Sequence, residues 1–244
     1  MLAFGWQTPV KLVLSGSIRS RDVLVSKIAA QMMADSSEVA SALDDGMLLD
    51  SLGMRRNCLL AYFIPDTYEL YWTDSAASVI SRMKREYDSF WNGDRLSKAA
   101  ALGLEPMEVS VVASIVTGET NHVPEMPAIA AVYLNRLRLG MKLQADPTVA
   151  YCFDYKPGRI LNEHLKVDSP YNTYLYPGLP PGPICAPSKA ALEAVLSPDS
   201  HSYLYFCASP DFDGTHRFAS TYAEHLRNAR EFHAALSRRQ RNGA

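Results

Sequence analysis

The sequence predicts an α+β fold: a helix-rich domain with short strands and a long proline-rich ordered loop region lining a groove. Three observations support this prediction. Apolar residues recur at helical spacing in several segments, whereas alternating patterns typical of strands are only about five residues long. Between Met141 and Pro187, prolines recur too often for a long helix or a central strand.

The N-terminal part contains a short strand followed by helices. Val10–Leu14 alternates like a strand with one buried face. Serines before charged and apolar residues are typical helix starts. The expected elements are a helix over Arg21–Met33 capped by Ser20 or Ser17, a short helix over Ser36–Leu43, an aromatic strand and turn within Tyr62–Trp72, and a helix from Asp74 or Ser75 to about Trp91.

The middle of the chain predicts two packed helices. Pro106 lies near the first turn of one helix, and Val112, Ile115 and Val116 fall on one face that ends in Glu119. A second helix is expected from about Pro127 to Leu139, with Gly140 as its stop.

The region Met141–Pro187 is expected to be a long ordered loop, and such segments are often binding surfaces. After it the sequence predicts more regular structure. The expected elements are a helix over Ser188–Leu196, strands Tyr203–Cys207 and Thr215–Phe218 joined through a turn at Asp213–Gly214, a helix from Ser220 to Leu236, and a frayed, solvated tail over Arg238–Arg241.

Composition excludes several classes of protein. The 244 residues are 48% hydrophobic, and 24 basic residues against 26 acidic ones give a net charge of −2. This composition is too apolar for a disordered chain and lacks the basic footprint of a nucleic-acid-binding protein. One domain is the simplest account. Cys58, Cys152, Cys185 and Cys207 lie far apart, which favours apolar fillers over a bridge or a metal site.

The sequence has no apolar window of about 20 residues that would cross a bilayer, and its start lacks the features of a signal peptide. At face value these features predict a cytoplasmic protein.

Glu119 is the candidate catalytic residue. A carboxyl at the end of an apolar stripe is desolvated, which raises its pKa and suits it to act as a general acid. The alternatives are that Glu119 turns into solvent or pairs with Arg136 or Arg138. His216 and His225 are expected to be structural.

The loop region supplies neutral donors, acceptors and aromatic rings of the kind that bind sugars. The same composition also suits a turn-rich surface, so it does not decide between the two. The chain has no P-loop, no G-x-S-x-G elbow and no H-E-x-x-H pair.

Several long motifs resemble the endolytic murein transglycosylases of the YceG-like family. They are Ala113–Thr120, Val132–Val149, Ser169–Tyr174 and Gly178–Ile184, in the family's order and spacing. Shorter matches are Ile64–Tyr68, Tyr203–Phe206, Gly214–Phe218 and the pair Glu224 and His225.

The resemblance implies an enzyme, a lyase that cleaves the bond between N-acetylmuramic acid and N-acetylglucosamine inside nascent peptidoglycan strands. Cleavage leaves 1,6-anhydromuramyl ends and terminates elongation. No metal or organic cofactor is implied. The family's catalytic glutamate, the second in a Glu-x-Glu-Thr motif, corresponds to Glu119, while Thr117 replaces the first glutamate.

A lytic transglycosylase needs one carboxylate, because the C6 hydroxyl of the substrate attacks the anomeric carbon, whereas ordinary glycosidases use two. Glu119 would protonate the glycosidic oxygen and then accept the C6 proton. The candidate substrate-binding residues are Gln144, Asp146, Thr148, Tyr171, Asn172 and Thr173. Asn135 and Arg136 are expected to anchor the loop.

Two alternatives remain open: a hydrolase in which Asp146 activates water, and a catalytically silent glycan-binding module for which Thr117 would be an early sign of decay. The resemblance also implies residues 1–9 as a remnant of a LysM-like portion, residues 10–240 as the catalytic domain, and peptidoglycan synthases as partners. It places the protein at the outer face of the bacterial cytoplasmic membrane, in the periplasm, anchored by an N-terminal helix outside this sequence, and so replaces the cytoplasmic prediction.

Overall fold

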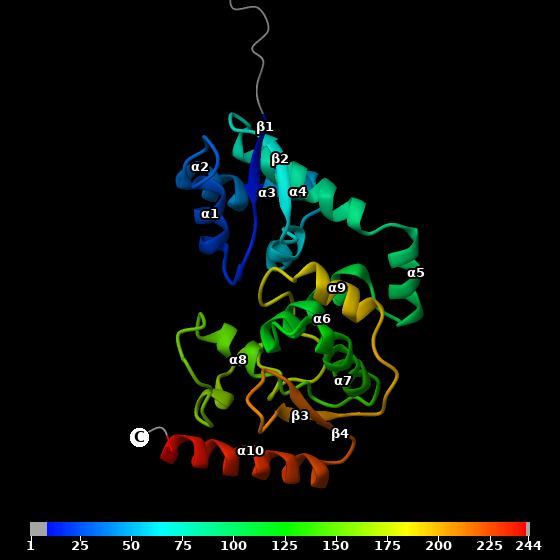
Figure 1. Ribbon diagram of the computed structural model, residues 1–244. Helices are drawn as coiled ribbons and strands as arrows, with labels where there is room; N and C mark the ends of the chain where they lie inside the picture. Colours follow the sequence, from blue (N-terminus) through cyan, green and yellow to red (C-terminus); the bar gives the residue numbers. More distant parts are fainter. Residues whose placement is uncertain (1–8, 243–244) are drawn as a thin grey trace, which may run out of the picture. The chain divides into compact units, whose positions relative to one another are not determined.

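Helices and short antiparallel strand pairs make up the protein, which confirms the predicted α+β class (Figure 1). The structure is a computed structural model that describes residues 9–242. Within that range the strands form two two-stranded sheets. The predicted remnant at residues 1–9 falls almost entirely outside the described residues.

The chain divides into two compact units. The first comprises the described residues up to Ser114 together with Pro181–Lys189, and the second comprises Ile115–Pro180 and the chain from Ala190 onward. The prediction of a single catalytic domain over residues 10–240 stays a prediction.

The first unit is built from helices around one strand pair. Val10 and Leu12 of the first strand pair with Leu70 and Tyr68 of the second, and Leu12, Leu70 and Tyr68 are buried. The elements are β1 (Pro9–Val13), α1 (Arg21–Ala29), α2 (Ser36–Asp44), α3 (Gly46–Ser51), η1 (Arg56–Tyr62), β2 (Thr67–Tyr71), α4 (Ala76–Phe90), α5 (Gly93–Ala101) and the larger part of α6 (Pro106–Glu119).

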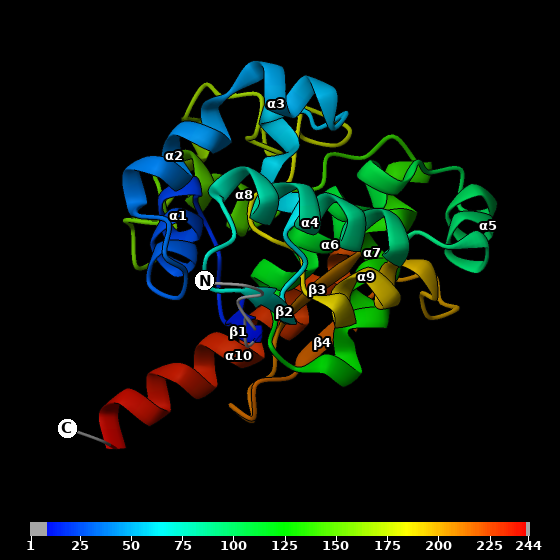
Figure 2. The same cartoon turned by 90° about the horizontal axis from the view of Figure 1, so that it is seen from above.

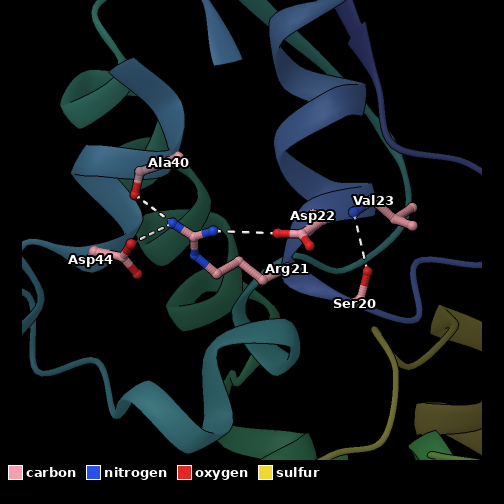
Figure 3. A network of polar contacts seen from close by, with 6 residues as sticks. All are labelled: Ser20, Arg21, Asp22, Val23, Ala40 and Asp44. Carbon is pink, nitrogen blue, oxygen red and sulfur yellow. Dashed lines mark hydrogen bonds and ion pairs between the residues drawn. The ribbon is translucent and has the colours of Figure 1, made fainter. Parts of the chain in front are cut away.

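Capping and one ion-pair network fix the helices after β1. The Ser20 hydroxyl accepts the backbone N–H of Val23 at 3.2 Å, which confirms the predicted cap of α1. From the same helix, Arg21 donates to the carbonyl of Ala40 at 2.8 Å and to Asp44 at 2.5 Å, so its guanidinium ties α1 to α2 (Figure 3). The predicted continuation of α1 to Met33 was wrong, because the helix ends at Ala29.

The second unit contains most of the residues in the sequence motifs. Ile115 and Val116 of α6 are fully buried, as are Ile129 and Val132 of the following helix, as the periodicity predicted. The elements are the end of α6, η2 (Val123–Glu125), α7 (Met126–Arg138), α8 (Asp146–Cys152), η3 (His164–Lys166), α9 (Lys189–Leu196), β3 (Tyr205–Ala208), β4 (His216–Ala219) and α10 (Tyr222–Asn242).

The hairpin of β3 and β4 packs against α10, and both views of the ribbon have the orange hairpin beside the red helix (Figures 1 and 2). The helix continues to Asn242, so the prediction of a frayed tail over Arg238–Arg241 was wrong. Arginine and glutamine are good helix formers, and basic side chains are favourable near the C-terminal end of the helix dipole.

The region between Met141 and Pro187 is mostly irregular and contains two short helices, α8 and η3. The short helix α8 begins at Asp146 within the expected loop. Pro147 does not prevent it, because proline in the first turn sacrifices no intrahelical hydrogen bond.

Between residues 9 and 242, no single helix is long and apolar enough to cross a membrane; α5 and α6 would satisfy the length and composition together but bend by 79° at their junction. All four cysteines are free thiols, with Cys58 and Cys185 buried.

Candidate active site

A pocket of about 320 Å³ in the second unit contains the candidate acid. Its wall combines residues from α6, α7, the start of α8, the loops before and after α8, β3 and α10. The lining residues are Glu119, Tyr133, Arg136, Leu143, Gln144, Asp146, Tyr174, Tyr205, Phe206, Tyr222 and His225.

Glu119 is the last residue of α6 and is half-buried. It continues the apolar stripe of α6. The other residues of this stripe are buried in the core, so they hold the helix in place while the carboxyl of Glu119 reaches the pocket. The Tyr133 hydroxyl of α7 donates a hydrogen bond of 2.5 Å to Glu119 Oε1. The partner of the carboxyl is therefore Tyr133 rather than Arg136 or Arg138, the alternative that the sequence left open.

The pKa of Glu119 is raised from 4.5 to about 7. Burial is the main cause, since it penalises the charged carboxylate, and the negative charge of Asp146 adds to it. The hydrogen bond from Tyr133 and the positive charge of Arg136 act in the opposite direction. At neutral pH the carboxyl is therefore divided between its acid and base forms, which suits a group that gives up a proton and takes one back.

Asp146 lies on the same pocket at the start of α8. The hydroxyl of Tyr174 donates to Asp146 Oδ1 at 2.6 Å, and burial raises the pKa of Tyr174, so that this tyrosine stays a donor. Three of the predicted site residues, Glu119, Gln144 and Asp146, thus line one pocket.

Gln144 adopts a left-handed backbone conformation, with φ of 51°. Its N–H donates to the carbonyl of Thr173 at 3.1 Å, and its exposed side chain lines the pocket. A non-glycine residue in this conformation is strained and persists where surrounding contacts fix it, as is frequent at functional sites.

Arg136 anchors the loop that carries Gln144, as predicted. This buried guanidinium donates to the carbonyls of Leu204 at 2.6 Å and Leu143 at 2.7 Å, and lies 5.1 Å from the centre of the Tyr205 ring. Asn135 donates to the carbonyl of His201 at 2.9 Å, which attaches α7 to the segment before β3.

Three predicted binding residues lie inside the protein rather than on the pocket. Thr148 and Thr173 are buried, with their hydroxyls 2.8 Å apart, and Asn172 is fully buried and donates to the carbonyls of Leu165 and Val167. These contacts fix the loop. Tyr171 is half-buried against Tyr151, with ring centres 4.6 Å apart, and does not line the pocket.

The sequence did not single out Tyr133, Tyr205, Phe206 or Tyr222 as site residues, although all line the pocket. His225, expected to be structural, also lines it; its buried Nδ1 has no hydrogen-bond partner within the described part of the chain. Burial lowers the pKa of His225. The apolar stripe of α7 includes Tyr133, and its spacing indicated only a core position. Tyr205, Phe206, Tyr222 and His225 reach the pocket only through the packing of the hairpin and α10, which the sequence does not indicate.

His216 matches its structural expectation. Its ring Nδ1 lies 2.9 Å from Glu125 Oε2, and its backbone N–H donates to Glu125 Oε1 at 2.9 Å. The ring also contacts Phe206 edge-on, with ring centres 5.3 Å apart. The pair of His216 and Glu125 joins β4 to the start of α7, and the contact of His216 with Phe206 supports the aromatic wall of the pocket.

A helix-borne, half-buried acid in a pocket of tyrosines and polar groups is an arrangement suited to general acid–base catalysis on a bound ligand. The model of the YceG-like family matches residues 7–231, and the chain belongs to this family. This confirms the resemblance found in the motifs.

Two bacterial proteins are similar to the chain in sequence. The chain is 30% identical over 217 residues to an endolytic murein transglycosylase of Bacillus subtilis, covering 83% of this chain and 59% of that protein. It is 31% identical over 193 residues to a protein of the same name in Streptococcus pneumoniae, covering 75% of this chain and 35% of that one. The chain thus spans less than two thirds of either relative.

The fold is also similar to a crystal structure of a YceG-like protein from Listeria monocytogenes. The TM-score is 0.76 at 29% sequence identity, and the match covers 90% of this chain and 76% of the Listeria chain.

Proposed function

We infer that the protein is an endolytic peptidoglycan lytic transglycosylase that uses Glu119 as both acid and base. The observation that carries the proposal is the Glu119 carboxyl itself, which lies on a pocket, accepts a hydrogen bond from Tyr133 and has a pKa raised to about 7. The relatives named endolytic murein transglycosylases support the choice of peptidoglycan as substrate.

The proposed reaction begins with protonated Glu119, which donates its proton to the oxygen between N-acetylmuramic acid and N-acetylglucosamine. The bond from that oxygen to the anomeric carbon of the muramyl sugar breaks, and the leaving sugar departs with a hydroxyl. The C6 hydroxyl of the muramyl sugar bonds to the anomeric carbon and gives its proton to the Glu119 carboxylate. The acid is regenerated, no water is consumed, and the new end is 1,6-anhydromuramic acid.

The surrounding residues support this use of one carboxyl. Tyr133 stays a donor because burial raises its pKa well above the usual value, so it holds Oε1 and leaves Oε2 for the substrate. Asp146 supplies negative charge that favours the oxocarbenium-like transition state. Gln144 and His225, which both line the pocket, are proposed to bind sugar hydroxyls. Tyr171 remains a predicted contact, and Thr148, Asn172 and Thr173 are proposed to act by fixing the loop.

A digest of purified glycan strands tests the proposal, with wild type, Glu119→Gln and the surface control Glu105→Gln compared by mass spectrometry. Wild type and the control are expected to release products with anhydromuramyl ends. Glu119→Gln is expected to release at least about a thousandfold less, because loss of general acid–base catalysis costs about 10²–10⁴-fold for each proton transfer. Circular dichroism checks that the variants are folded. Full activity of Glu119→Gln would refute the role of this residue.

The position of Asp146 on the same pocket supports a second candidate function, that of a hydrolase. A hydrolase requires a second carboxylate near the acid. In that reaction Asp146 would activate water opposite Glu119. The products decide, because a hydrolase leaves reducing ends one water heavier than anhydro ends. Glycan binding without any cleavage by wild type would instead indicate a silent glycan-binding module.

The proposed substrate sets the proposed location, because murein lies outside the cytoplasmic membrane. We expect the protein in the periplasm or at the outer face of that membrane, with peptidoglycan synthases as partners. Fractionation of the native cells with an antibody to this chain tests the location, and recovery in the cytosol would contradict it.

A further inference from the structure

Glu119 lies on two pockets rather than one. The second pocket, of about 700 Å³, is also entirely within the second unit. It shares with the first pocket only Glu119, and both volumes are within the range of about 300–1,000 Å³ typical of ligand sites. Its other lining residues are Thr120, Asn121, His122, Ala208, Ser209, Phe212, Gly214, Thr215, His216, Phe232 and Arg239.

The wall of the second pocket combines aromatic rings with polar groups. Phe212 and Phe232 contact each other with ring centres 5.8 Å apart, and the Arg239 guanidinium lies 4.8 Å from the centre of the Phe212 ring. Asn121 and His122 are exposed beside them. Sugars present apolar ring faces and polar edges, and they bind to surfaces that combine aromatic faces with hydroxyl, amide and imidazole groups.

Phe212 is held in an unusual conformation. Its φ is 55°, in the left-handed region, where a bulky non-glycine residue is an outlier. The loop around it is fixed by its own bonds: Ser209 N donates to the carbonyl of Thr215 at 2.8 Å, and Asp213 accepts from Thr215 N at 2.9 Å and from its hydroxyl at 2.6 Å. The backbone therefore stores strain while presenting the Phe212 ring to the pocket, a pattern associated with functional sites.

We propose that this second pocket is a sugar subsite on the far side of the scissile bond, with Phe212 as its stacking face. Cleavage inside a strand leaves sugars on both sides of the broken bond, and the acid must lie at the oxygen between them. Glu119 meets that condition because it lines both pockets. The first pocket then holds the sugar on one side of the bond and the second pocket holds the sugar on the other. The assignment rests on the proposed action on glycan strands.

The test measures binding separately from cleavage. The parent is Glu119→Gln, and the probe is a set of GlcNAc–MurNAc oligosaccharides of increasing length from amidase-treated peptidoglycan, with Kd measured by calorimetry. Adding Phe212→Gly is expected to weaken binding of the longer oligosaccharides about tenfold, as expected for the loss of one aromatic contact. Phe212→Tyr keeps the ring and is expected to restore parental affinity.

Glycine is chosen because it adopts the left-handed conformation without strain, so the variant loses the ring while the loop remains folded. An unchanged Kd for Phe212→Gly overturns the subsite, as does the absence of binding by the parent. The proposed function fails separately: if wild type releases no products while Phe212→Gly still weakens binding, the subsite stands without the reaction. If wild type forms anhydro products and Phe212→Gly changes neither Kd nor KM, the reaction stands without the subsite.

Discussion

The hydroxyl of Tyr133 donates a 2.5 Å hydrogen bond to Glu119 Oε1, and this bond counteracts the burial that raises the pKa of the carboxyl to about 7. The two residues lie on successive helices, α6 and α7, so their geometry depends on the packing of two stable elements rather than on a loop. Tyr133 thus acts on the proposed reaction through the pKa and orientation of Glu119.

Tyr133→Phe is expected to move the alkaline limb of the kcat profile upward by about one pH unit. The bond stabilises the carboxylate, and a hydrogen bond to a charged group contributes about 1.5–3 kcal/mol. Because 1.36 kcal/mol corresponds to one pKa unit, a shift of about one unit is the lower end of the expected effect. The maximal rate should fall about tenfold, because the carboxyl loses its orientation. The pH dependence of anhydro-product release by the purified protein measures both effects.

Tyr151→Phe is the matched control, since it removes a tyrosine hydroxyl from an aromatic cluster that does not line the pocket. Its profile should coincide with that of wild type. A Tyr133→Phe profile with an unmoved or lowered alkaline limb would contradict the role assigned to the hydrogen bond.

Asp146→Asn is expected to shift the alkaline limb in the opposite direction. The charge of Asp146 raises the pKa of Glu119, so its removal lowers that pKa. A shift of about half a unit would reduce the protonated fraction of Glu119 near pH 7 by about twofold, and loss of the charge that favours the oxocarbenium-like transition state would lower the rate further. The asparagine oxygen still accepts from Tyr174, which preserves the local structure. Anhydro ends should persist among the products; loss of all cleavage would favour the hydrolase.

Thr148→Val tests whether the buried threonines fix the loop or bind substrate. Thr148 Oγ1 donates to the carbonyl of Ala145 at 2.7 Å and pairs with Thr173, so the change leaves buried partners unsatisfied. The free energy of unfolding should fall by about 1–3 kcal/mol, with KM nearly unchanged. Denaturant titration measures the free energy of unfolding, and steady-state kinetics measure KM. Thr148→Ser, which keeps the hydroxyl, is the control. A raised KM at unchanged stability would place Thr148 among the binding residues.

The sequence predicted the elements that depend on local patterns and missed facts that depend on three-dimensional packing. Glu119 was identifiable because it ends an apolar stripe, and the cap at Ser20 because capping is local chemistry. Tyr133 lies on an equally regular stripe, where a tyrosine that faces an acid cannot be distinguished from one that fills the core. Asn172 and Gln144 come from one polar region, yet only tertiary structure decides that the first is buried and the second exposed.

Glu119→Gln is also expected to change stability in a pH-dependent way. The folded-state pKa of Glu119, about 7, lies above its ordinary value of 4.5. The stability associated with the protonated carboxyl is therefore fully present below pH 4.5 and is lost as the pH rises through 7. At 1.36 kcal/mol per unit, the loss in wild type amounts to about 3 kcal/mol.

Glutamine carries no charge to desolvate, so the variant escapes this loss. Relative to wild type, Glu119→Gln should become more stable by up to about 3 kcal/mol between pH 4 and pH 8.5, measured as the free energy of unfolding in urea. Glu105→Gln, which removes an exposed carboxyl just before the same helix, is the control for loss of one negative charge. The same pH dependence in both variants would mean that Glu119 is not desolvated by the fold, and the basis for its action as an acid at neutral pH would be lost.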